Sequence, residues 1–196
     1  MKAARTLAAL VAATALAGCG ASSDASDEKG MDLKAAAARA DDITLTTLNA
    51  VKPGVKWSFS VSSGGLAHGA KAGPDATGTV TRRAAVRTIV SEERGGALAA
   101  MVEAGWKKQG YTITYRSSHG HPEVEAATKD GFQLSFGTGS GTQFTLIVKT
   151  PEARLSEVPA PTAKGTGSVD PAPGPNSANI RDAYWSNDGA STLTPS

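Results

Sequence analysis

The sequence predicts an α+β protein in which two helices pack on one face of an antiparallel sheet of about five to six strands. Three observations favour this fold class. Apolar residues recur with helical spacing in two stretches, and they alternate with polar residues in several others. A Lys-Asp-Gly turn at residues 129–131 joins two of the alternating stretches, as in an antiparallel hairpin. Runs of such strands with two helices predict helices gathered on one face of the sheet.

The first helix is expected over residues 31–51. Its apolar stripe is mostly alanine, with larger residues at a few positions, namely Leu33, Ile43, Leu45, Leu48 and Val51. Pro53-Gly54 ends this helix. The stretch VKWSFSV, residues 55–61, alternates apolar and polar residues and predicts a strand. Residues 63–77, rich in Gly, Ala and His, are expected to form a loop.

The stretch TGTVTRRAAVRTIV, residues 77–90, predicts a second and longer strand. Because side chains alternate across a strand, its residues divide into two faces. The apolar face holds Val80, Ala84, Val86 and Val90, and the polar face holds Thr81, Arg83 and Arg87.

A second helix is expected to follow directly. Ser91 suits the N-cap position, the carboxylates of Glu92 and Glu93 suit the positive end of a helix dipole, and Gly110 suits a C-terminal stop. The apolar stripe of this helix is Leu98, Met101, Val102, Gly105 and Trp106. Four strands then follow, at about 111–116, 122–128, 131–137 and 143–149.

The amino terminus has the parts of a secretory signal. Lys2 and Arg5 precede an apolar run at residues 7–17, which is too short to span a bilayer. The run ends in Leu16-Ala17-Gly18-Cys19, which resembles the lipobox of bacterial lipoproteins. That resemblance implies that diacylglycerol is attached to the Cys19 thiol and that residues 1–18 are removed. An ordinary signal peptide with a chance cysteine is the alternative.

Removal of residues 1–18 changes the charge balance of the chain. The whole chain has 20 basic and 18 acidic residues, and the removed part holds two basic residues and no acidic ones. The remaining chain therefore has no basic surplus, and we expect no nucleic-acid binding. Cys19 is the only cysteine, so stability must come from packing and not from disulfides.

The sequence divides into three zones after the signal. Residues 19–30 are small, polar and charged, and they predict a flexible tether. Residues 31–150 hold the sustained apolar periodicity of one α+β domain. Residues 151–196 hold seven of the ten prolines and predict a disordered tail. Within this tail, Ile180, Tyr184 and Trp185 form an aromatic island, which either stays unstructured, docks on a partner or folds back on the domain.

The polar face of the sheet is the candidate binding surface. Arg83, Arg87 and Gln133 are expected to project from the sheet on the side opposite the helices, together with Thr81 and Ser135. If that side is uncovered, it can bind a glycan, a peptide or another envelope polymer. The alternative is an ordinary hydrated sheet face, or one that the first helix covers.

No pattern in the sequence predicts catalysis, a metal or a cofactor. His119 and His121 form a pair, but the third histidine, His68, lies in another predicted loop, and a metal site needs three or four ligands. The segment GTGSG at 137–141 lacks the pattern of a phosphate-binding loop or a nucleophile elbow. Glu123 and Glu125 share a strand face without a visible apolar pocket, so we expect solvated carboxylates.

The lipobox LAGC, the stretch WKKQGYTIT and the stretch DGFQLSF together resemble small secreted actinobacterial lipoproteins of unknown function. The resemblance implies a protein held at the extracytoplasmic face of the cell membrane through Cys19. With no catalytic set visible, we expect a non-enzymatic envelope module that binds a ligand or a protein partner. The alternative is an accessory component of an envelope hydrolase or of an assembly complex.

Overall fold

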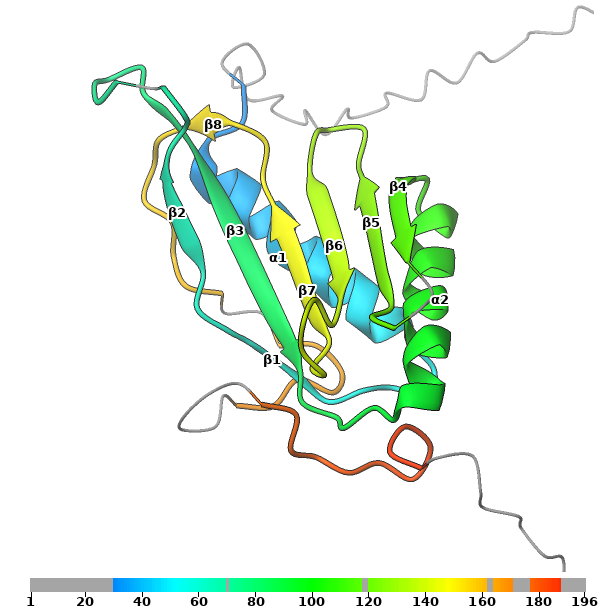
Figure 1. Ribbon diagram of the computed structural model, residues 1–196. Coiled ribbons are helices and arrows are strands. Elements are labelled where there is room, and N and C mark those ends of the chain that lie inside the picture. The colour runs from blue at the N-terminus through cyan, green and yellow to red at the C-terminus, as the bar shows by residue number, and fades with distance from the viewer. Residues whose placement is uncertain (1–29, 70, 118–119, 162–163, 171–176, 188–196) are drawn as a thin grey trace, which may run out of the picture.

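The computed structural model describes residues 30–69, 71–117, 120–161, 164–170 and 177–187. Two helices pack against one antiparallel sheet of eight strands (Figure 1), which confirms the predicted α+β class. The expected signal segment 1–18, and the expected tether except Gly30, lie outside the described residues.

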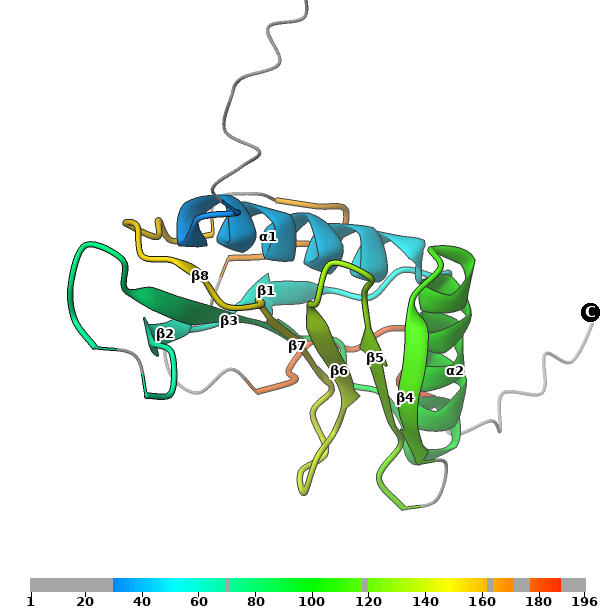
Figure 2. The same ribbon diagram turned by 90° about the horizontal axis from the view of Figure 1, so that it is seen from above.

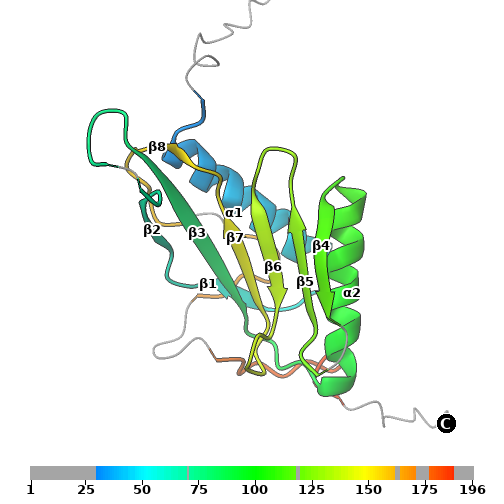
Figure 3. The same cartoon turned by 45° about the horizontal axis from the view of Figure 1, so that its top comes forward.

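The sheet has the strand order β1-β3-β7-β6-β5-β4, and every pair of neighbouring strands is antiparallel (Figure 3). Two further short strands, β2 and β8, pair with β3. The strands are β1 Trp57–Phe59, β2 Ser63–Leu66, β3 Thr77–Val86, β4 Thr112–Ser117, β5 Glu123–Ala127, β6 Gln133–Gly137, β7 Thr145–Lys149 and β8 Ala153–Arg154.

The long strand β3 organises one half of the sheet, because different strands pair with its two ends. On one side it pairs with β1 and β2, and on the other with β7 and β8. The six strands that alternation predicts all occur, although β3 ends at Val86 and not near residue 90. β2 and β8 are absent from the prediction, because SGGL shows no apolar alternation and β8 has only two residues.

Helix α1, Leu33–Ala50, lies across the half of the sheet that contains β3 and β7 (Figures 1 and 2). Asp32 caps its first turn, since the carboxylate accepts a hydrogen bond from the amide of Ala35 at 2.8 Å. The face turned to the sheet is built of fully buried alanines, namely Ala36, Ala37 and Ala40. These small side chains let the helix lie close to the strands.

Helix α2, Glu92–Lys108, packs against β4, β5 and β6 at the other end of the sheet. Its buried Trp106 donates a hydrogen bond from the indole Nε1 to the hydroxyl of Thr47 on α1, at 2.9 Å. Ser91 occupies the predicted N-cap position, but its hydroxyl donates to the carbonyl of Asn187 and makes no cap hydrogen bond. Gly110, with φ of 78°, ends the helix as predicted.

The core lies between the helices and the sheet face that they cover. Alternate residues of the strands point into it, among them Val80, Ala84, Val124, Leu134, Phe136, Leu146 and Val148. The opposite sheet face is mostly polar and partly or fully exposed, except where Ser58 and Ala85 are buried. Neither helix of the described chain has the length and apolar content that crossing a bilayer requires.

Contacts with the domain continue past residue 150, the predicted end of the domain. β8 pairs with β3, and the Ser156 hydroxyl accepts a hydrogen bond from the amide of Lys34. Trp185 is fully buried, and its indole donates to the carbonyl of Pro53 at 3.0 Å. The described parts of this segment therefore pack against the domain, where burial of the aromatic island offsets the cost of ordering it. Residues 162–163, 171–176 and 188–196 lie outside the description.

Candidate functional site

Two of the three predicted binding residues, Arg83 and Gln133, lie exposed on the polar face of the sheet. They do not form one cluster. Arg83 on β3 is opposite Ile147 of β7, whereas Gln133 on β6 is opposite Lys149 of the same strand. The two side chains are therefore separated by an intervening strand and stand in different rows.

The third predicted residue, Arg87, does not lie on this face. It follows the end of β3 and is only 2% exposed. Its Nη2 donates a hydrogen bond to the side-chain oxygen of Asn179 at 3.1 Å, and its backbone carbonyl accepts from the amides of Asn179 and Ile180. Arg87 follows the end of β3 at Val86, and its contacts with Asn179 and Ile180 bury it.

Helix α1 does not cover the polar sheet face, because it packs on the other side of the sheet. A hollow of about 450 Å³ lies on it, over β5, β6 and β7. Its lining includes Glu125, Gln133, Ser135 and Lys149, so it carries charge of both signs. Arg83 is not part of this hollow.

The other chemistry-bearing residues stay apart in the described chain. His68 and His121 are exposed, and the ring Nδ1 of His121 lies 3.4 Å from the Thr138 hydroxyl. Glu123 accepts a hydrogen bond from Ser135 at 3.1 Å. The described residues contain no group of three or more metal-ligating side chains. Cys19 and His119 lie outside the description.

A cleft of about 600 Å³ lies at the β2 edge of the sheet, on the helix side. One wall is the chain from Ser60 to Gly65, which we call the β2 wall. The other is the segment from Leu155 to Pro161, which we call the C-terminal wall. The floor is formed by Val80 and Arg82 of β3, and Leu33 at the start of α1 closes one side. Its size is within the range of ligand pockets in proteins.

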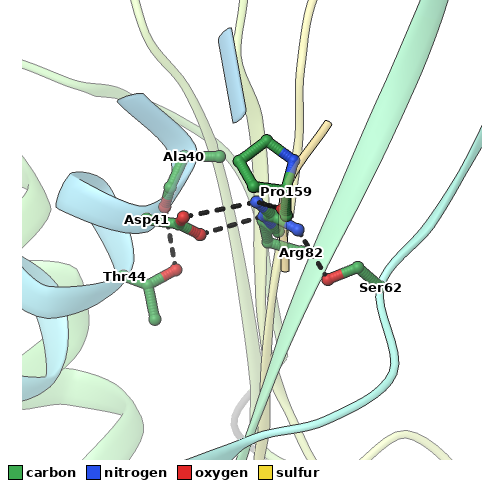
Figure 4. Close-up of polar contacts among 6 residues, drawn as sticks. All are labelled: Ala40, Asp41, Thr44, Ser62, Arg82 and Pro159. Carbon is green, nitrogen blue, oxygen red and sulfur yellow. Dashed lines mark hydrogen bonds and ion pairs between the residues drawn. The ribbon is translucent and has the colours of Figure 1, made fainter. Parts of the chain in front are cut away.

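Arg82 is the polar centre of the cleft floor (Figure 4). Arg82 is only 2% exposed. Its guanidinium Nε lies 2.9 Å from Oδ1 of Asp41 on α1. Nη2 also donates to the carbonyl of Pro159 at 2.8 Å, and Nη1 donates to the hydroxyl of Ser62 at 3.0 Å. One side chain thus ties together α1, the β2 wall and the C-terminal wall.

The ion pair removes the net charge from the cleft floor. Burial raises the pKa of Asp41 above its ordinary value, while the Arg82 guanidinium acts in the opposite direction. The contact between two oppositely charged groups at 2.9 Å makes the pair electrically neutral as a unit. A ligand in the cleft therefore meets hydrogen-bonding groups and apolar side chains without a free charge.

Gly64 leaves the middle of the cleft open. It lies opposite Val80, whose side chain points to the helix side, so a side chain at position 64 would project into the cleft. A Cβ there would lie 3.1 Å from the Thr79 carbonyl oxygen and 3.3 Å from the Val80 Cγ2 atom, so a side chain at position 64 fits only with a small shift of β2. The next residue, Gly65, lies opposite Thr79 and projects to the other face, where a Cβ would meet no atom within 4 Å.

The sequence contains a pattern that could have indicated this site, namely one charged residue on each of two otherwise apolar faces. Arg82 shares the apolar face of its strand with Val80 and Ala84, and Asp41 sits beside Ala37 and Ala40 on the buried face of α1. A single charge of opposite sign on each of two facing apolar surfaces indicates a buried pair. The C-terminal wall gave no such signal, since its composition resembles that of a linker.

Comparisons with known proteins give one similar structure. No family model matches the chain, and no curated protein matches it. A DUF4853 family protein from Actinomyces odontolyticus is similar with 9% sequence identity and a TM-score of 0.43, over 65% of this chain and 71% of that one. A likeness of this extent assigns neither a family nor an activity to this chain.

Proposed function

We propose that this chain is a non-enzymatic binding protein of the bacterial envelope, held at the extracytoplasmic face of the cell membrane by lipid on Cys19. The observation that carries the binding role is the cleft of about 600 Å³ between the β2 wall and the C-terminal wall. Its size, its mixed lining and its fixed polar floor are typical of a preformed ligand site.

The chemistry of the lining supports binding over catalysis. Among the described residues that line the cleft, Arg82 is the only ionisable one, and three of its nitrogens are already engaged by Asp41, Ser62 and Pro159. Serine hydroxyls are present, but the described lining holds no histidine, lysine or carboxylate to activate one of them. The arrangement therefore suits recognition by shape and hydrogen bonding.

The cleft is a better candidate than the polar sheet face. Its walls come from segments far apart in the sequence, and hydrogen bonds from Lys34 and Arg82 fix the C-terminal wall in place. The hollow over β5, β6 and β7 lies within one layer of strands and is smaller, at about 450 Å³. Arg83 and Gln133 on that face remain predicted contacts for a second, weaker surface.

The position of the cleft also fits a membrane anchor. Leu33, which lines the cleft, follows the first described residue, Gly30, by three positions. From Cys19 to Gly30 the chain can span at most about 40 Å, at roughly 3.6 Å per residue. A lipid on Cys19 would therefore keep this end of the domain near the membrane surface.

Matched substitutions in β2 test the binding role. We expect Gly64→Val to fill the cleft, whereas Gly65→Val places the same side chain on the opposite face. Each full-length variant is expressed in the source bacterium, cross-linked in intact cells and purified through an affinity tag. We expect Gly64→Val to capture envelope molecules, whether protein or glycan, at least about fivefold less than the wild type, and Gly65→Val to capture them normally.

Thermal unfolding of both variants provides the control for folding. A melting temperature for Gly64→Val close to that of Gly65→Val assigns the loss to the cleft. Equal capture by the wild type and both variants would remove the cleft from the binding role.

A further inference from the structure

The free edge of β2 lies beside the cleft, and its unpaired backbone groups indicate which class of ligand the cleft can bind. β2 pairs with β3 on one side, and no strand of the described chain pairs with its other side (Figures 1 and 3). The amide of Ala67 donates to the carbonyl of Thr77, so by alternation Ser63 and Gly65 also direct their backbone groups to β3. The backbone groups of Gly64 and Leu66 then point away from the sheet.

The hydrogen bonds of β3 agree with this assignment. Val80, which lies opposite Gly64, exchanges hydrogen bonds with Thr150 on the far side of β3, at 2.9 Å in each direction. Val80 therefore uses its backbone groups away from β2, as expected for a pair that is not hydrogen-bonded across the two strands. All four residues of β2 are exposed.

The two edges of the sheet differ in their protection against strand pairing. At the β4 edge, the register shifts between Ile113 and Tyr115, α2 packs against the strand, and Arg116 contributes a charge. Bulges, charges and covering helices are the usual means of blocking an edge. β2 has two glycines and no charged residue or proline, so its edge is short but chemically open to another strand.

We propose, as an extension of the proposed binding function, that the ligand is an extended, uncharged peptide segment that adds to the free edge of β2 as a further strand. Backbone pairing with Gly64 and Leu66 would supply the hydrogen bonds. Side chains on one face of the added strand enter the cleft beside Gly64 and meet Val80, Val158 and the serines of the β2 wall.

The neutrality of the cleft selects against charged side chains. A carboxylate or ammonium group placed over the Arg82–Asp41 pair would lose its hydration without gaining a free counter-ion. The exposed Val61 and Leu155 at the rim add apolar contacts. An acyl chain lacks the alternating donors and acceptors that a strand edge requires, so a peptide is the better match.

A peptide panel with backbone methylation tests this proposal. The full-length protein in detergent micelles is titrated by calorimetry with acetylated, amidated hexapeptides that alternate Ser-Val, Ser-Leu, Ala-Val or Thr-Ala. Charged counterparts alternate Lys-Val or Glu-Val. The best uncharged peptide is then made in two forms, N-methylated at residues 1, 3 and 5 or at residues 2, 4 and 6.

Strand addition predicts an asymmetry between the two methylated forms, because only alternate amides of an added strand face β2. We expect one form to lose at least tenfold in affinity and the other to stay within about threefold of the unmethylated peptide. The charged peptides should bind at least tenfold more weakly than the uncharged ones. Hydrogen exchange at the Leu66 amide should slow on binding, while Gly64→Val and the rim variant Val61→Asp should weaken binding and Gly65→Val should not.

Two outcomes would overturn the proposal. The first is equal tolerance of both methylated forms, since binding would then not use the backbone. The second is binding of none of the uncharged hexapeptides. If Gly64→Val still reduces capture from cells in that case, the cleft binds another class of molecule and the proposed binding function stands without this inference.

Discussion

At the scale of single residues, the buried pair of Arg82 and Asp41 links elements that pack around an apolar layer. Taking two charges out of water is costly, and removal of one partner from such a pair typically destabilises a protein by about 3–5 kcal/mol. The geometry here adds hydrogen bonds from the same guanidinium to Ser62 and Pro159. The pair therefore sets how α1, β3 and the C-terminal wall are placed relative to one another.

Glu103 on α2 is a second charged residue held by ion pairs, and its contacts predict a pH dependence of the stability. Its carboxylate lies 2.6 Å from the Lys107 ammonium and 3.2 Å from the Arg116 guanidinium of β4. The hydrogen bond from Lys107 and the charge of Arg116 lower the pKa of Glu103 below its ordinary value of 4.5, against the opposing effect of burial. The folded state thus favours the ionised form, so this contribution to stability is present above pH 4.5 and is lost as the pH falls below it.

We expect Glu103→Gln to lower the free energy of unfolding by about 1 kcal/mol at pH 7 and by little at pH 3. Urea unfolding at both pH values measures the difference. Glu157→Gln, at an exposed position of the C-terminal wall, is the control and should change stability by less than about 0.5 kcal/mol at either pH. A Glu103→Gln penalty that is the same at pH 3 as at pH 7 would contradict the assignment.

At the scale of elements, the periodic segments were predictable and the short or irregular ones were not. α1, α2 and six strands follow from apolar spacing, because each buries one regular face. β2 and β8 are recognised as strands by their pairing with β3, and such long-range pairing leaves no local pattern in SGGL or in two residues of a proline-rich segment. The candidate site depends on these unpredicted parts, so sequence reasoning placed the binding surface on the opposite face, with Arg83 and Gln133.

The segment at residues 177–187 is a further element that composition alone describes poorly. Thr88 pairs with Ile180, and the amides of Ile89 and Ser91 donate to the carbonyls of Ile180 and Trp185. Tyr184 stacks edge-on against Trp185, with the guanidinium of Arg94 4.3 Å from the Tyr184 ring centre. The segment thus ties the end of the described chain to the start of α2.

We expect Trp185→Ala to destabilise the domain by about 3–5 kcal/mol, because the indole is fully buried and bonded to Pro53. Tyr184→Ala is the matched control, since its side chain is 36% exposed and should cost about 1 kcal/mol or less. Urea unfolding of both variants measures the difference. Equal and small penalties would show that the segment contributes little to the stability of the fold.

At the scale of the whole molecule, the fold and the proposed lipid anchor depend on different parts of the chain. The described residues contain no cysteine, so packing, hydrogen bonds and the buried ion pair stabilise the domain without a disulfide. Both helices of the described chain pack on the sheet, and neither is long and apolar enough to cross a bilayer. The proposed membrane attachment is assigned to lipid on Cys19, which lies outside the described residues.

Cys19→Ala tests this separation. A single acyl chain binds a membrane only marginally, so stable attachment needs the two or three chains that a lipidated cysteine carries. We expect the variant to leave the membrane fraction or to remain unprocessed, while its domain keeps the melting temperature of the wild type within about 1 °C, because no described contact uses a thiol. Cell fractionation with mass spectrometry of the amino terminus, and calorimetry of the released protein, provide the two measurements. Normal processing and continued membrane binding of the variant would exclude the lipid anchor, and a lowered melting temperature would show that the anchored segment also supports the fold.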